Sequence, residues 1–96
     1  MSPLKKKKLE NIRNKLDKLD NRLITIIKQR TKLVDKVLSV KEKKNQIIDK
    51  TRIKKILTNI KKKSIKNNID PKITKRIWIN MIYAFIDYEK KKFKKK

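Results

Sequence analysis

The sequence contains no cysteine, no histidine and no glycine. Without cysteine there is no disulfide framework, no thiol nucleophile and no thiolate metal site. Without histidine there is no Ser-His-Asp triad and no imidazole ligand for a metal. Without glycine there is no P-loop and no dinucleotide fingerprint, and a chain with only two prolines as well is not typical of a turn-rich β fold. An enzyme made from this chain is therefore expected to use no metal and no cofactor.

Long apolar runs are also missing. No stretch approaches the ~18 apolar residues that would span a membrane, and no apolar signal-peptide core follows the cluster Lys5–Lys8. We therefore expect a cytoplasmic protein without a membrane partner. The 96 residues allow one domain at most, and hydrophobic residues make up only 36% of them, so the core of a monomer would be thin.

Positive charge, in contrast, is abundant. The chain has 32 Lys and Arg against 9 Asp and Glu, a formal net charge of +23. Of these cations 27 are Lys, and Lys, Ile and Asn, all with A/T-rich codons, supply 51 of the 96 positions. Binding to nucleic acid or to another anionic surface is one interpretation. The even spread of Lys favours a solvated polar face and codon bias, so a nucleic-acid partner is not expected.

A long helix is predicted over about residues 3–43. Ser2 and Pro3 fit an N-cap and a first helical residue. About 40 helical residues would extend ~60 Å, which requires other helices or a second subunit for cover. The apolar residues of this segment alternate in spacing of three and four, as in a helical stripe with a heptad-like period: Leu9, Ile12, Leu16, Leu19, Leu23, Ile26, Leu33, Val37 and Val40.

A second helix is predicted over about residues 50–66. Asp49 is its expected N-cap, and Asn67 or Asn68 could end it, because Asn is the best substitute for a missing C-cap glycine.

A third helix is predicted over about residues 71–92. Asp70 and Pro71 fit its N-cap and first residue, and the basic tail Lys90–Lys96 is expected to fray. The whole chain, residues 1–96, is thus expected to be one all-α domain with one long N-terminal helix and two shorter ones. A homodimer in which the long helices pack together is the natural way to cover the stripe.

Arg30 interrupts the apolar stripe, and a guanidinium there is costly to bury unless it is paired. Lys41, eleven residues later, would lie on nearly the same face of a continuing helix. In a chain that uses Lys almost everywhere, Arg13, Arg30 and Arg52 lie near apolar faces, and Arg grips carboxylates bidentately as Lys cannot. One interpretation is a site for a small dianion. The other is pairing with carboxylates of the chain: Asp17, Asp35 or Asp49.

Glu89 ends an apolar stripe of the third predicted helix, which also carries Trp78, Ile82 and Phe85. Its side chain either reaches solvent or points into a pocket, where a protonated carboxyl could donate a hydrogen bond.

These residues together resemble a known family. Residues 12–23, with Arg13 followed by Leu16-Asp17, begin an apolar segment that ends in Gln29-Arg30. The ordered set is similar to the pattern of the all-helical (type II) chorismate mutases, over about residues 9–90: Arg13, Arg30, Lys41, Asp49, Arg52 and Trp78. The resemblance implies an intertwined homodimer with two active sites. It also implies the pericyclic rearrangement of chorismate, a dicarboxylate, to prephenate in the shikimate pathway for Phe and Tyr. That reaction needs a compact substrate conformer and complementary charge rather than a nucleophile.

The resemblance also implies roles for individual residues. Arg13 would reach a substrate carboxylate across the dimer, Arg30 would hold a carboxylate from its own chain, and Arg52 would line the same pocket. Lys41 would hydrogen-bond the ether oxygen, where negative charge develops. Glu89 would donate a second hydrogen bond to that oxygen, which requires a protonated carboxyl, so activity is expected to fall as pH rises. Asp49 is expected to complete the substrate-binding set.

Two positions depart from the mutase pattern. Ile53 stands where mutases usually carry a Glu, and Phe85 stands where some carry a small hydroxyl residue. Both residues line the expected pocket and look more like the isochorismate pyruvate-lyases, which share the fold and produce salicylate and pyruvate. Asp49 and Glu89 look more like a mutase. The mutase is the preferred prediction, ahead of the lyase, an inactive mutase fold, and a helical nucleic-acid-binding or dimerisation protein.

Overall fold

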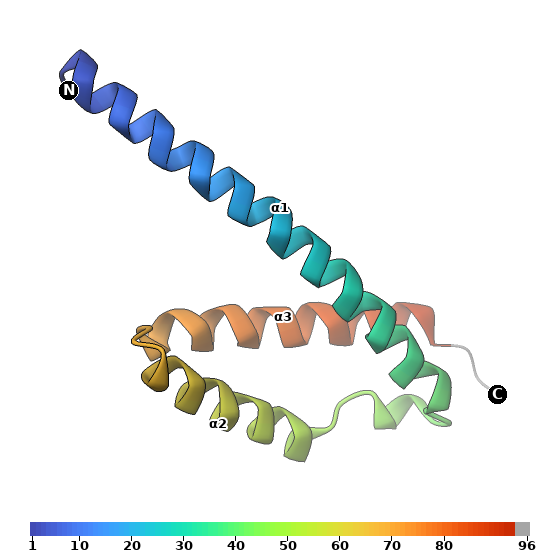
Figure 1. Ribbon diagram of the computed structural model, residues 1–96. Coiled ribbons are helices and arrows are strands. Elements are labelled where there is room, and N and C mark those ends of the chain that lie inside the picture. The colour runs from blue at the N-terminus through green and yellow to red at the C-terminus, as the bar shows by residue number, and fades with distance from the viewer. Residues whose placement is uncertain (94–96) are drawn as a thin grey trace. The chain divides into compact units, whose positions relative to one another are not determined.

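The computed structural model describes residues 1–93. Within them the regular structure is entirely helical, which confirms the all-α prediction. The elements in chain order are α1 (Pro3–Val40), the short 3₁₀ helix η1 (Lys44–Gln46), α2 (Lys50–Lys66) and α3 (Pro71–Lys92) (Figure 1). Of the tail that was expected to fray, Lys90–Lys92 continue α3, and positions 94–96 lie outside the described residues.

The chain divides into two compact units, Met1–Leu33 and Val34–Lys96. The first unit consists of the N-terminal part of α1, whose start is stabilised by the Ser2 hydroxyl oxygen, an acceptor 3.3 Å from the Lys5 backbone nitrogen. No residue of α1 is buried. The predicted apolar stripe is about half exposed, between 49% and 56%, at five positions: Ile12, Leu16, Leu19, Leu23 and Ile26. This unit therefore has no apolar core of its own.

The helix α1 ends at Val40, earlier than the predicted end near residue 43. The Gln46 side chain explains the early end, because its Oε1 atom accepts hydrogen bonds from the backbone amides of Glu42 (2.8 Å) and Lys43 (2.9 Å). These amides would otherwise extend the helical ladder. Lys41 therefore follows the last residue of α1 directly, and its expected place on the same face as Arg30 stays a prediction.

Local capping begins both helices of the second unit where the sequence predicts. The Asp49 carboxylate accepts a hydrogen bond from the Arg52 backbone amide at 2.9 Å and caps α2. The Asp70 carboxylate accepts from the Lys72 amide at 2.9 Å, with Pro71 as the first residue of α3. Each cap satisfies a backbone donor that has no partner within the helix.

Asn68 ends α2 in the left-handed region, with a φ of 58°. The Ile69 amide bonds to the Ser64 carbonyl at 2.9 Å, and the Asn68 amide bonds to the Ile65 carbonyl at 3.2 Å. This pair of bonds is a Schellman motif, with Asn in the position that Gly usually takes. The motif turns the chain from α2 into α3.

The core of the second unit is small, as the composition predicts. Its buried apolar side chains are Ile47, Ile82 and Ile86. Half-buried and partly exposed neighbours pack against them: Leu38, Ile53, Ile56, Leu57 and Phe93. Between α2 and α3 the buried hydroxyls of Ser64 and Thr74 lie 2.6 Å apart and share a hydrogen bond. The core thus joins α2, α3 and the segment that follows α1.

No helix within residues 1–93 combines the length and the apolar character needed to cross a membrane.

Candidate active site

Lys41 and Glu89 meet at one end of the second unit. The Lys41 Nζ atom lies 3.2 Å from Glu89 Oε2 and donates to it. It also donates to the Ile47 carbonyl at 3.4 Å. The side chains are 18% and 9% exposed, respectively, so the pair lies largely away from water. At such a place an ion pair interacts more strongly than at the surface.

The apolar core explains why these two residues meet. Glu89 lies seven residues after Ile82 and three after Ile86, so the three share one face of α3. Both isoleucines are buried together with Ile47, which fixes the segment after α1 beside α3. Lys41 belongs to that segment. The structure thus excludes the interpretation in which Glu89 reaches solvent: the side chain is buried and paired with Lys41. It lines neither hollow of the second unit, so the interpretation in which it points into a pocket stays a prediction.

A solvent-accessible hollow of about 550 Å³ is lined by Lys41 but not by Glu89, and we call it the Lys41 hollow. Lys41 and Asp49 both line it, with Gln46 between them in sequence. Asp49 uses one carboxylate oxygen, Oδ1, to cap α2. A carboxyl group has lone pairs for more than one bond, so this cap leaves Asp49 able to accept a hydrogen bond from a ligand.

The remaining predicted residues of the second unit have separate surroundings. Arg52 is exposed on the first turn of α2. Ile53 packs against the apolar core and lines a different hollow, between α2 and α3. Phe85 is half-buried, and its ring makes an edge-to-face contact with Tyr88, with 6.4 Å between centroids. Of the predicted site residues, Lys41 and Asp49 thus line the Lys41 hollow, and these three residues do not.

Arg13 and Arg30 lie on α1 in the first unit. Arg13 is exposed, and Arg30 is half-buried. Their parts in substrate binding stay predictions from the resemblance.

Two features of this region are not predicted by the sequence pattern. Gln46 closes the loop after α1 and lines the Lys41 hollow. Tyr88 donates a hydrogen bond from its hydroxyl to Asp35 Oδ1 at 2.7 Å. That bond, with smaller effects from desolvation and from the negative charge of Asp35, raises the pKa of Tyr88 above its ordinary value. Neither contact has a sequence signal, because Gln46 bonds to the backbone and the Tyr88–Asp35 pair is far apart in the chain.

The chemistry available at the Lys41 hollow is that of hydrogen bonds and charge. Among residues 1–93, no three Asp, Glu, His or Cys side chains are grouped closely enough to hold a metal ion. A lysine ammonium can stabilise negative charge that develops on a substrate oxygen. A neighbouring carboxyl group can accept a hydrogen bond when ionised and donate one when protonated.

The comparison with known protein families gives a match over most of the chain. The family model described as chorismate mutase type II matches residues 12–90. The matched range begins on the apolar stripe of α1 and ends one residue after Glu89, so it includes Lys41 and Glu89. No curated protein and no solved structure matched the chain.

Proposed function

This chain belongs to the chorismate mutase type II family, and on that premise we propose that it converts chorismate to prephenate. The observation that carries the proposal is the family match over residues 12–90. The reaction is pericyclic, so the protein has to hold a reactive conformer and stabilise the charge of the transition state. A chain without histidine and cysteine can supply both.

Lys41 is the proposed main source of that stabilisation. Negative charge develops on the ether oxygen of chorismate as the C–O bond breaks, and the Lys41 ammonium would donate a hydrogen bond there. An ammonium has three N–H donors, and within the described residues Glu89 and the Ile47 carbonyl engage two of them. The third is available to substrate in the Lys41 hollow. These two contacts hold the ammonium in place before substrate binds, which lowers the cost of reorganisation.

Glu89 is the proposed second donor to the ether oxygen. In the ion pair with Lys41 it acts as an acceptor, and it can donate only after it takes up a proton. The active form of the enzyme would then carry a protonated Glu89. This proposal requires activity that decreases as pH rises.

Three arginines are proposed to bind the substrate carboxylates. Arg30 and Arg52 would act within their own chain, and Arg13 would act on the site of a second copy in a homodimer. The half-exposed apolar stripe of α1 supports this assembly, because in the isolated chain its side chains have no apolar cover. We accordingly propose a homodimer with two sites, acting in the biosynthesis of aromatic amino acids.

Isochorismate pyruvate-lyase activity is the alternative suggested by Ile53 and Phe85. The packing of Ile53 against the apolar core gives that residue a structural reason to be apolar. Phe85 likewise contacts Tyr88. Packing of these two residues is compatible with either activity, and the mutase stays the preferred proposal because the matching family model is that of the mutases.

The test is a paired assay of the purified protein with chorismate and, separately, with isochorismate, with products resolved by chromatography. We expect prephenate from chorismate. If the protein forms salicylate and pyruvate from isochorismate but little prephenate from chorismate, its activity is that of the lyase and not of the mutase. The absence of both products would contradict either enzyme.

A further inference from the structure

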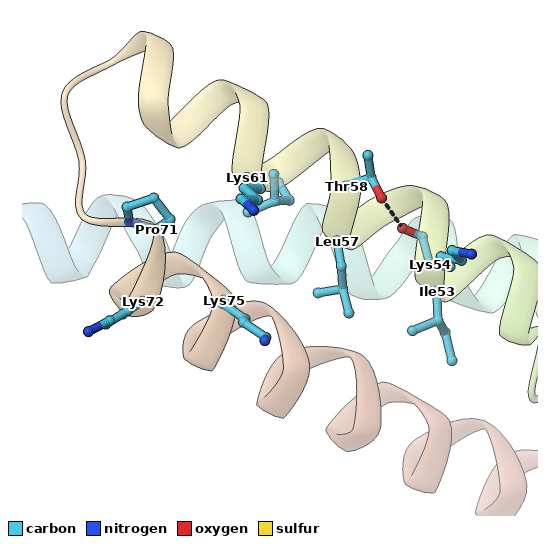
Figure 2. Close-up of a pocket in the computed structure, with 9 residues that line it drawn as sticks. Ile53, Lys54, Leu57, Thr58, Lys61, Pro71, Lys72 and Lys75 are labelled. Atoms are coloured by element: carbon cyan, nitrogen blue, oxygen red, sulfur yellow. Dashed lines mark hydrogen bonds between the residues drawn. The ribbon is translucent and has the colours of Figure 1, made fainter.

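A second hollow, of about 600 Å³, lies between α2 and α3, and we call it the α2–α3 hollow (Figure 2). Its floor is apolar. Ile53 and Leu57 project from α2 toward α3, and Pro71 closes the end near the turn between the helices (Figure 2). The volume falls within the range of small-molecule sites in proteins, ~300–1,000 Å³. The hollow shares no lining residue with the Lys41 hollow.

Four lysines border the α2–α3 hollow from both sides. Lys54 and Lys61 belong to α2, and Lys72 and Lys75 belong to α3 (Figure 2). None of the lining residues is acidic, and none of these four ammonium groups takes part in an ion pair among the described residues. The sequence of α2 contains no acidic residue at all. An apolar floor therefore lies within a ring of positive charge that the chain does not neutralise locally.

We propose that the α2–α3 hollow binds a small organic anion with an apolar body, of the class of aromatic carboxylates. The ring would cover Ile53 and Leu57, both partly exposed, and thereby remove apolar surface from water. The carboxylate would lie among the four ammonium groups and form charge-assisted hydrogen bonds with them. A neutral apolar compound would gain the burial of apolar surface but not the charge-assisted hydrogen bonds.

The α2–α3 hollow is distinct from the Lys41 hollow, although Ile53, which the resemblance assigns to the substrate pocket, lines it. A carboxylate at the Lys41 hollow would contact Lys41 and Asp49, whereas one in the α2–α3 hollow would lie between the N-terminal turns of α3 and the middle of α2. Binding here does not depend on mutase activity, so it can be measured without an enzyme assay.

The experiment is a titration of the ¹⁵N-labelled full chain with 2-naphthoate, followed by two-dimensional ¹H–¹⁵N spectra. The uncharged 2-naphthamide, of nearly the same shape, is the ligand control. We expect saturable shifts of the amide signals of residues 53–61 and 72–75, with a dissociation constant of about 1 mM or below for a ligand of this size. The 2-naphthamide should bind at least about fivefold more weakly, because it gains no ionic contact.

Matched variants test the role of the lysines. The double change Lys54→Gln and Lys61→Gln removes two rim charges and should weaken 2-naphthoate binding about fivefold. The pair Lys55→Gln and Lys62→Gln removes the same charge from neighbouring positions of α2 that do not line the hollow, and it should leave binding nearly unchanged. Both variants lie on exposed positions, so both should keep well-dispersed spectra.

Several results would overturn the proposal. Equal weakening by the two pairs of substitutions would show general attraction to a basic protein rather than a site. Shifts centred on residues 40–51, or their loss in Lys41→Gln, would assign the ligand to the Lys41 hollow. Equal affinities for 2-naphthoate and 2-naphthamide would show that the hollow does not select an anion. The absence of saturable shifts would mean that the hollow is closed to small molecules, as when a second copy of the chain covers it.

Discussion

Lys41 Nζ and Glu89 Oε2 lie 3.2 Å apart, although 48 residues separate the two in sequence. The pair connects the segment after α1 to the last turns of α3. Of the two residues, Lys41 lines the Lys41 hollow, which Asp49 also lines. The function proposed for this chain requires the ammonium and the carboxyl group to reach one substrate oxygen together. The arrangement is the structural basis of the function proposed for this chain.

The first prediction concerns Glu89 and pH. For the wild-type protein, kcat/KM for chorismate should fall with rising pH, because only a protonated carboxyl at position 89 can donate a hydrogen bond to the ether oxygen. In Glu89→Gln the amide nitrogen donates at every pH, so this decrease should disappear. The measurement is a pH–rate profile of both proteins from mildly acidic to mildly alkaline buffers.

The matched control for that profile is Asp87→Asn, which changes an exposed carboxylate two residues away on the same helix. It should retain the wild-type dependence. A flat wild-type profile, or an equal slope in Glu89→Gln, would exclude Glu89 as a proton-dependent donor.

The second prediction concerns the origin of Arg13 at the site. Arg13→Ala and Lys41→Ala should each be nearly inactive alone. If Arg13 acts across a homodimer, unfolding and refolding the two variants together creates mixed dimers with one intact site, so about a quarter of wild-type activity should return. The measurement is the rate of prephenate formation before and after mixing.

Wild-type protein taken through the same refolding supplies the reference rate for this mixing experiment. A mixture no more active than the separate variants would place Arg13 and Lys41 of each site on the same chain.

The third prediction concerns Tyr88. Its hydrogen bond to Asp35 raises the pKa of the Tyr88 hydroxyl above the ordinary value of 10.0. In a Tyr83→Phe background Tyr88 is the remaining tyrosine, and its titration can be followed by tyrosinate absorbance. Replacing Asp35 by Ala in that background should lower the titration midpoint. An unchanged midpoint would show that the bond does not hold in solution.

The same bond predicts how stability depends on pH. The folded state keeps the Tyr88 proton to higher pH than the unfolded chain, because the hydrogen bond to Asp35 raises the pKa of Tyr88. The stabilisation of the fold by this bond is therefore complete below about pH 10, and it is lost as pH rises through the raised pKa. Tyr88→Phe should therefore unfold more readily than wild type near neutral pH, with a smaller difference in strong alkali. Thermal unfolding followed by circular dichroism measures both.

The fourth prediction concerns the buried hydroxyls between α2 and α3. Thr74→Val removes one partner of the 2.6 Å contact with Ser64 and should lower the free energy of unfolding by about 1–2 kcal/mol. Thr58→Val, at an exposed position where the hydroxyl bonds only within its own helix, should change it by less than about 0.5 kcal/mol. Urea unfolding measures the free energy of unfolding of both variants. Equal decreases in Thr74→Val and Thr58→Val would show that the Ser64–Thr74 hydrogen bond does not stabilise the fold more than a bond within one helix.

The parts of the fold that depend on neighbouring residues could be predicted from the sequence. Asp49, Asp70 and Pro71 begin helices because caps act within one turn. Asn68 ends α2 because it tolerates the left-handed conformation. These interactions are local, so the residue types and their order suffice to predict them.

The parts that depend on contacts between distant segments could not be predicted in the same way. The end of α1 is a local exception, because the Gln46 side chain binds amides only three and four residues away, and backbone amides give no signal in the residue types. The burial of Glu89 depends on Ile47 and Lys41, which reach it only after the chain folds. The surroundings of Ile53 could not be predicted either. A comparison with mutase motifs shows that Ile53 replaces the usual Glu, but it does not show that Ile53 packs against the core.

The most direct test of the central claim is the rate of prephenate formation from chorismate by the wild-type protein and by Lys41→Ala, purified in parallel. An expression host without its own chorismate mutase excludes contamination, and Lys44→Ala, in the exposed η1 segment, is the matched lysine control. We predict an enzymatic rate for wild type and Lys44→Ala, and a decrease of about 10²–10³-fold in kcat for Lys41→Ala. A wild-type rate no faster than the uncatalysed reaction, or equal rates for wild type and Lys41→Ala, would contradict the account.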